Sequence, residues 1–279
     1  MFSNFIVPKP PVDMIMPSMW QTFFLVATSI TLLLMSLYCL WILWRDHDSV
    51  PILTVFGGVI AAGTIEHIIG PAGLLWYPSI GQNSLIEFAG RSYPVFIFTG
   101  NGFWYGPAMI LLGGLLVKAK SKLHIWMIFG GIALFDLGME AFGSWTGVFR
   151  YYGDQGIRLF GFPLWWDFQN GALTLLIAWI IVQLRHSYLK GWRSLFIIPM
   201  IPCLAMAGNG FEGLYAWLAI NSNIPRLVLP GTLASVGMAL ITVDLVASQY
   251  GKKEGSKRDT VTASTCSRDT QKAETGVLR

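Results

Sequence analysis

The sequence of 279 residues places several acids and amides inside long apolar stretches. Asp136 and Glu140 are four residues apart, so both lie on one face of a helix. Asn209 and Glu212, which are three apart, do the same. A carboxylic acid kept out of water favours its neutral form, and a neutral acid can protonate an alcohol, hemiketal, epoxide or alkene. These residue types therefore indicate acid-initiated chemistry on an apolar molecule.

An acid inside an apolar stretch would cost roughly 2.5 to 3.5 kcal/mol at the middle of a bilayer if it faced lipid. We therefore expect these side chains to face the protein interior. The polar residues concerned are Glu66, His67, Asn101, Asp136, Glu140, Asp167, Gln169, Asn170, Asn209, Glu212 and Asp244.

The apolar stretches themselves predict a membrane protein. Of all residues 54% are hydrophobic and 12% are charged, whereas roughly 25% of residues are charged in an ordinary globular protein. About 20 apolar residues cross a bilayer as a helix. The sequence thus predicts an all-α integral membrane bundle of seven transmembrane helices. The predicted spans are Trp20 to Trp44, Pro51 to Ile69, Pro94 to Val117, Leu123 to Phe142, Phe162 to Leu184, Ser194 to Ile220 and Arg226 to Ser248.

The short loops predict the orientation, because Lys and Arg favour the cytosolic side. We expect the N-terminus outside and the C-terminus in the cytosol. The chain divides into an N-terminal segment 1–19, a membrane domain 20–248 and a disordered cytosolic tail 249–279. The host membrane is the plasma membrane in a bacterium or the endoplasmic reticulum in a fungus. The basic residues on the predicted cytosolic side are Arg45, Lys118, Lys120, Lys122, Arg185, Lys190, Arg193 and those of the tail.

On this topology most of the acids share one depth. Glu66, Asp136, Glu140 and Glu212 fall in the outer halves of spans that run outward, and Asp167 opens an inward span at the same level. Asp244 alone lies near the cytosolic face. We therefore expect the outer halves of the spans to converge on one polar cavity.

Two outer loops, residues 74–94 and 144–171, lie above the expected cavity and are rich in aromatic and turn residues. They are expected to form its lid and to contribute substrate contacts. Trp and Tyr also gather at any membrane interface, so the same residues fit a purely structural role. The candidate binding residues of the loops are Trp76, Tyr77, Gln82, Tyr151, Tyr152, Trp165 and Trp166.

Glu66 is the expected proton donor, and the neighbouring His67 is expected to tune or relay its proton. Asp136, Glu140 and Asp167 are expected to act as the base or to hold a leaving water molecule. The alternative is that each acid only joins helices through hydrogen bonds, which contribute about 0.6 kcal/mol on average.

Asn209 and Glu212 are expected to position substrate oxygens. Tyr151, Tyr152, Trp165 and Trp166 are expected to line the cavity, where their aromatic faces would stabilise a cationic intermediate by about 0.5 to 2 kcal/mol each. The expected partners are a hydrophobic small-molecule substrate and the lipid bilayer.

No cofactor, metal or nucleic acid is expected. The last span holds no Lys that could carry retinal, and four His at scattered depths do not match a membrane di-iron site. The basic residues reflect membrane orientation and the tail, so they do not indicate nucleic-acid binding.

Three stretches resemble the AveC-type spirocyclase family, multi-span proteins named for the cyclase of avermectin biosynthesis. The resemblance implies a membrane cyclase that forms a spiroacetal from a dihydroxy-ketone polyketide, with dehydration as a second activity in the founding member. It assigns no role to individual residues. The stretches are "LLWYPSIGQNSLIEFAGRSYPVF", "RYYGDQGIRLFGFPLWWDFQNGA" and "GNGFEGLYAWLAINS", within roughly residues 66 to 222.

A weaker resemblance links the chain to the small seven-span terpene cyclases of fungal meroterpenoid pathways. Glu66 in "GTIEHII" and Asp244 in "ITVDLVAS" occupy places similar to an early Glu and a late Asp of those enzymes. This resemblance implies protonation of a prenyl epoxide or alkene. Asp244, however, falls on the opposite side of the predicted membrane from the other acids.

A third alternative is not an enzyme. Acids inside membranes also serve proton relays, so a proton-coupled transporter or a seven-span receptor stays open at this point.

Overall fold

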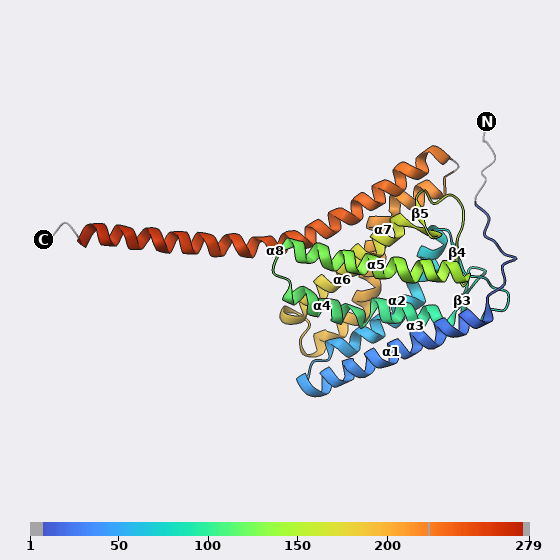
Figure 1. Cartoon of the computed structure of the whole chain (residues 1–279). Helices are drawn as coiled ribbons and strands as arrows, with labels where there is room; N and C mark the ends of the chain where they lie inside the picture. Colours follow the sequence, from blue (N-terminus) through green and yellow to red (C-terminus); the bar gives the residue numbers. More distant parts are fainter. Residues whose placement is uncertain (1–7, 223, 276–279) are drawn as a thin grey trace.

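The computed structural model describes residues 8–222 and 224–275, with side chains described up to Tyr250. Seven helical segments of this part are long and apolar enough to cross a membrane, so the predicted seven-helix, all-α fold is confirmed (Figure 1). The helices are α1 (Ser18–Asp46), α2 (Val50–Ala72), α3 (Val95–Tyr105), α4 (Ala108–Lys118), α5 (Lys122–Thr146), α6 (Leu164–Ser187), the 3-10 helix η1 (Gly191–Phe196), α7 (Ile197–Ile220) and α8 (Pro225–Thr275).

The third span consists of two helices, α3 and α4, with Gly106 and Pro107 between them. Pro107 has no N–H to donate to the preceding turn, and Gly106 adopts φ −102° and ψ −107°, away from helical geometry. The sequence predicted one uninterrupted span because hydropathy does not register a break in the backbone.

Two helices form the centre of the bundle. α2 packs on α1, α3 and α7, and α6 packs on α4, α5, α7 and α8. α1 lies at the edge against α2 and α3, and its apolar residues Leu33, Leu34 and Leu37 are exposed. Apolar residues point outward there because the solvent of this surface is lipid and not water.

α2 and α3 approach so closely that glycine is required at the crossing. A Cβ atom added to Gly58 would lie 2.3 Å from the carbonyl oxygen of Gly102 and 2.6 Å from Cα of Gly106. A Cβ atom on Gly106 would lie 2.7 Å from the carbonyl oxygen of Thr54. This crossing holds α2 and α3 side by side over several turns, including the turn of α3 that carries Asn101.

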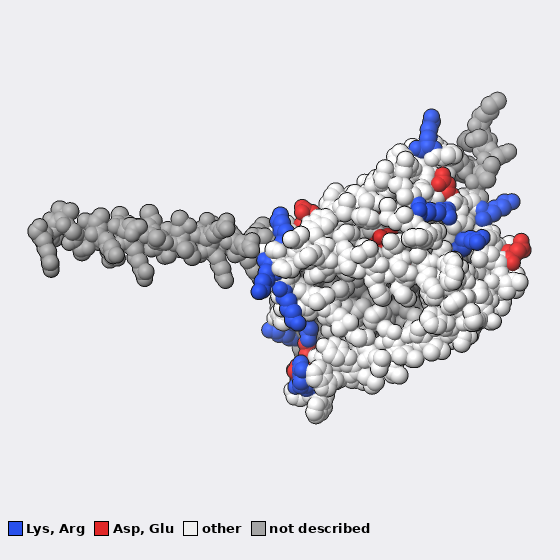
Figure 2. Space-filling view, in the orientation of Figure 1, with Lys and Arg blue, Asp and Glu red and all other residues white. Residues whose placement is uncertain are grey.

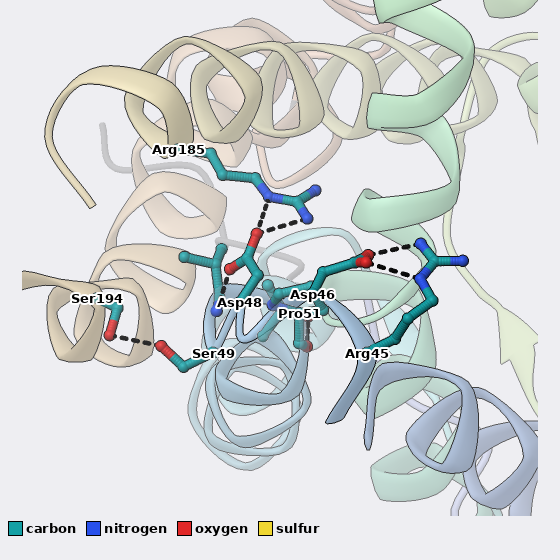
Figure 3. Close-up of polar contacts among 9 residues, drawn as sticks. Arg45, Asp46, Asp48, Ser49, Pro51, Arg185 and Ser194 are labelled. Atoms are coloured by element: carbon teal, nitrogen blue, oxygen red, sulfur yellow. Dashed lines mark hydrogen bonds and ion pairs between the residues drawn. The ribbon is translucent and has the colours of Figure 1, made fainter. Parts of the chain in front are cut away.

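The turn between α1 and α2 is fastened to α6 and η1 (Figure 3). Asp48 Oδ2 accepts from Arg185 Nε at 2.6 Å and pairs with its Nη2 at 2.6 Å. The other oxygen, Oδ1, accepts from the Val50 N–H at 2.9 Å, and Ser49 donates to Ser194 at 2.9 Å. One carboxylate thus ties the start of α2 to the end of α6.

Lys and Arg gather at both ends of the bundle, and the surface between the two ends is almost uncharged (Figure 2). We call the end that holds the α1–α2 turn and the α4–α5 turn the basic end, and the opposite one the loop end. Which end faces the cytosol stays a prediction. The predicted disordered tail begins inside α8, and its side chains after Tyr250 lie outside the described residues, so that expectation also stays a prediction.

The two loops of the loop end are joined by backbone pairing. Leu75 in one loop lies opposite Tyr151 in the other, and Arg91 donates to the Leu75 carbonyl at 3.2 Å and to the Tyr152 hydroxyl at 3.1 Å. The two loops that were expected to lie above the cavity therefore also contact each other. The antiparallel pairs are β1 (Leu75–Trp76) with β4 (Arg150–Tyr151), β2 (Ser84–Phe88) with β3 (Arg91–Pro94), and β5 (Arg158–Leu159) with β6 (Phe162–Pro163).

Gly58→Ala tests the close crossing of α2 and α3. The new methyl group meets backbone atoms that cannot rotate away, so we expect a loss of about 1 to 3 kcal/mol and a lower melting temperature in detergent. Gly114→Ala is the matched control, because no atom outside its own helix backbone lies within 4 Å of the added Cβ. An unchanged melting temperature for Gly58→Ala would contradict the described crossing.

Asp48→Asn tests the ion pair at the basic end. Loss of the charge weakens the hydrogen bonds from Arg185, and we expect destabilisation of roughly 1.5 to 3 kcal/mol, measured by thermal unfolding. The control is Asp46→Asn, whose partner Arg45 is its sequence neighbour and joins no other element. Equal effects of the two changes would argue against a specific role for Asp48.

Candidate active site

A cavity of about 220 Å³ lies inside the bundle beneath the loop end. Its walls come from α1, α2, α3, α5, α6 and the two loops. Three of the predicted acids line it: Glu66 from α2, and Asp136 and Glu140 from α5. The structure therefore brings acids from two separate helices to one space.

Glu66 is 4% exposed and uses both carboxyl oxygens. The Tyr77 hydroxyl donates to Oε1 at 2.8 Å, and Asn101 Nδ2 donates to Oε2 at 3.0 Å. Rotation of the Asn101 amide by half a turn presents its oxygen instead, which would accept the proton of a neutral Glu66. The same neighbours can therefore serve Glu66 before and after proton transfer.

Asp136 and Glu140 lie one helical turn apart on α5, and both line the cavity. Asn170 Nδ2 donates to Asp136 Oδ2 at 3.0 Å, and the Tyr151 hydroxyl donates to Glu140 Oε2 at 2.8 Å. The β1–β4 pairing sets the position of Tyr151. A loop residue thus holds the side chain of a helix residue, which couples the loop end to the acids.

Tyr77 and Tyr151 remain hydrogen-bond donors at all ordinary pH values. Burial raises the pKa of the Tyr77 phenol well above its usual range, and the neighbouring Glu66 carboxyl raises it further. Burial also raises the pKa of Tyr151, with Glu140 as the next cause. Each phenol therefore keeps its proton and continues to donate to its carboxyl partner.

Aromatic rings form much of the remaining wall. Phe149 makes edge contacts with Tyr77 and Tyr151, each with ring centroids 6.0 Å apart. Trp166 contacts Tyr151 at 5.3 Å, and Phe24 of α1 also lines the cavity. Aromatic faces attract cations, so this wall suits a reaction that develops positive charge.

His67 does not take part in this network. Its ring stacks on Tyr93 at 4.1 Å between centroids and lies 5.2 Å from Phe88. Neither ring nitrogen has a hydrogen-bond partner among the described residues. The expected relay from His67 to Glu66 is therefore not supported, because successive helix residues point about 100° apart.

Asp167, Asn209 and Glu212 are buried but do not line the cavity. Gln169 Nε2 donates to Asn209 Oδ1 at 2.5 Å. Glu212 is fully buried, and neither of its oxygens has a partner among the described residues. Of the residues expected to share one polar cavity, these three therefore do not line it, and the Gln169–Asn209 hydrogen bond joins α6 to α7.

Four of the predicted binding residues build the loop end and do not line the cavity. Trp76 lies under the Arg91 guanidinium at 5.4 Å, and Tyr152 accepts from the same Arg91. Trp165 Nε1 donates to Gln155 Oε1 at 3.2 Å, and Gln82 Nε2 donates to the Pro78 carbonyl at 2.9 Å. Tyr77, Tyr151 and Trp166 are the predicted loop residues that do line it.

Asp244 is exposed on the surface of α8 and lies outside the cavity. The expectation that all acids face inward is wrong for this residue. It lies near the basic end of α8, on a face that is not packed on the bundle, where water and headgroups can reach a charge.

Sequence reasoning did not include several cavity residues among the candidates. Asn101 and Asn170 are two of them, and for each the sequence signal is an amide in an apolar stretch. Tyr105 and the α1 residues Phe24 and Thr28 also line the cavity. Nothing in the sequence of α1 distinguishes these positions from its lipid-facing ones.

The arrangement combines three carboxyl groups, amide and phenol donors, and an aromatic wall around one cavity. It can donate a proton, accept another and surround a cation. Among the described residues no group of three His, Cys, Asp or Glu side chains is placed to hold a metal ion. Comparison with protein-family models, with curated proteins and with solved structures finds no match for this chain.

A hydrophobic carbodiimide, which adds to neutral carboxyl groups in apolar surroundings, tests the placement of the acids. We expect stable labelling at Glu66, Asp136 or Glu140, because these groups border the cavity. Glu212 should stay unlabelled, because it is fully buried away from the cavity. Mass spectrometry of peptides from the labelled protein locates the adduct, and preferential labelling of Glu212 would contradict this cavity.

Proposed function

We propose that this chain is an integral membrane cyclase that closes a ring in a hydrophobic, oxygen-bearing substrate by acid catalysis. The main support is the convergence of Glu66, Asp136 and Glu140 on one aromatic-walled cavity. The resemblance of its sequence to AveC-type spirocyclases suggests the same chemistry. A keto-diol that closes to a spiroacetal is the substrate class we favour.

In the proposed reaction, one substrate hydroxyl first adds to the ketone to give a hemiketal. Glu66 donates its proton to the hemiketal hydroxyl, the carbon–oxygen bond breaks and water leaves. The second hydroxyl attacks the resulting oxocarbenium carbon, and its proton passes to Glu140 or Asp136. In the net reaction, one keto-diol gives one spiroacetal and one water molecule. The enzyme regains its starting state when the proton returns to Glu66.

The cavity residues have separate roles in this proposal. Tyr77 and Asn101 orient Glu66 and stabilise the carboxylate left after proton donation. Tyr151 and Asn170 do the same for the α5 pair. The aromatic wall surrounds the cation and keeps other water from capturing it.

Terpene cyclisation is less well supported, because it would rely on Asp244, which is exposed outside the cavity. A proton-coupled transporter is the second candidate. Its support is Glu212, a fully buried acid without a hydrogen-bond partner among the described residues, which would give the bundle a further site for a moving proton.

The test compares lipophilic extracts of the source organism with and without the gene by mass spectrometry. A precursor should accumulate at the mass of the lost product plus one water. Genes for Glu66→Gln and Glu212→Gln are then returned to the deletion strain. We expect product formation by the Glu66 variant to be lower than that of the parent gene by about a hundredfold or more. The Glu212 variant should restore the product.

Both variants are also purified to show that they are folded in detergent. Full product formation by Glu66→Gln would overturn the proposed acid. Unchanged metabolites in the deletion strain, together with a proton flux in liposomes that Glu212→Gln abolishes, would favour the transporter.

A further inference from the structure

A second hollow, of about 680 Å³, lies on the outside of the bundle between α4 and α5. It is almost entirely apolar, with Leu111 and Leu115 on one side and Met127 and Gly131 on the other. The face drawn in Figure 2 is hollowed in this region, in front of α4 and beside α5. We call this hollow the α4–α5 groove.

The α4–α5 groove adjoins the acid cavity. Phe103, Trp104 and Phe135 line both spaces. The Trp104 and Phe135 rings stack at 6.0 Å between centroids with 9° between their planes. These two side chains are therefore the partition between the groove and the carboxyl groups, and a change of their rotamers would join the two spaces.

The packing of the helices leaves the α4–α5 groove open to the side. α5 packs on α6 and α8, and α4 packs on α6, so the two walls of the groove are held from behind. Toward the loop end, Phe142 of α5 contacts Trp20 and Phe23 of α1, so aromatic rings join α5 to α1 there. At the basic end the α4–α5 turn closes it. The remaining access is sideways, from the lipid.

The far end of the groove carries positive charge. Lys118 and His124 line it there, and Lys118 forms no ion pair with another described residue. Ala108 to Lys118 span ten helical steps, or about 15 Å. An extended alkyl chain can lie along this length, with an anionic group at Lys118 and its other end beside Trp104.

We propose that the α4–α5 groove binds the apolar chain of the substrate, and that the substrate enters the acid cavity sideways from the bilayer past Trp104 and Phe135. This inference rests on the proposed function and specifies its substrate class. The substrate is a long-chain lipophile with an anionic group, such as a carboxylate, at one end and its reacting oxygens at the other. The cavity of about 220 Å³ holds only the reacting part.

Filling the groove is the sharpest test. Gly131 and Gly138 are both exposed on α5, and a Cβ on either meets no atom within 4 Å beyond its own helix backbone. Gly131 lines the groove, whereas Gly138 lines neither space. In the deletion strain, Gly131→Phe should lower product formation about tenfold or more, and Gly138→Phe should leave it unchanged. Both variants should melt like the parent protein.

A binding assay separates this inference from the proposed reaction. The full-length protein in nanodiscs is irradiated with a long-chain fatty acid that carries a diazirine in mid-chain. We expect labelling of residues 108–135 that excess unlabelled fatty acid suppresses and that Gly131→Phe abolishes. Lys118→Gln should weaken labelling by the acid, while the labelling by the matching fatty alcohol stays the same.

Each outcome decides one point. Labelling that persists in Gly131→Phe, or that phospholipid suppresses as well as fatty acid does, would overturn the groove as a substrate site and leave it to bilayer lipid. Equal effects of Lys118→Gln on acid and alcohol would overturn the anionic end of the substrate. Specific labelling combined with an active Glu66→Gln variant would leave the groove as a ligand site and reject the acid mechanism.

Discussion

Hydrocarbon offers no hydrogen-bond partner, so a polar group inside this bundle is stabilised only when another part of the protein supplies one. Three acids meet this constraint in the same way, with a donor from another element for each: Tyr77 and Asn101 for Glu66, Asn170 for Asp136 and Tyr151 for Glu140. The acids are therefore not an isolated site added to a finished scaffold. They connect α2, α3, α5, α6 and both loops.

The loop end supplies two of these hydrogen-bond donors. Short β-pairs would be marginal in water by themselves, yet β1 and β4 place Tyr77 and Tyr151 beside the carboxyl groups of two different helices. Arg91 fastens the pairing from outside through the Leu75 carbonyl and the Tyr152 hydroxyl. The aromatic and turn residues of these loops thus build a cover whose inner surface belongs to the cavity.

The bundle is also asymmetric in a way that matters for an apolar substrate. Glycines let α2 and α3 touch at the backbone, whereas α4 and α5 stand apart and leave a hollow between them. Close packing on one side fixes Glu66 and Asn101, and in the route that we propose the open packing on the other side admits the lipid-soluble substrate. Asp48 and Arg185 hold the basic end together without occupying that path.

The sequence by itself determined the number and approximate limits of the spans, because hydrophobic length and the cost of charge in lipid are properties of each segment alone. It also indicated that most of the acids are buried. Only the tertiary structure decided which of them meet, because that depends on the rotation of each helix about its axis. Glu66 faces the cavity while its neighbour His67 stacks on Tyr93, and Glu140 joins the site through Tyr151 while Glu212 stays apart. A turn of about 100° per residue separates such neighbours, and no local pattern fixes which face the rest of the bundle will cover.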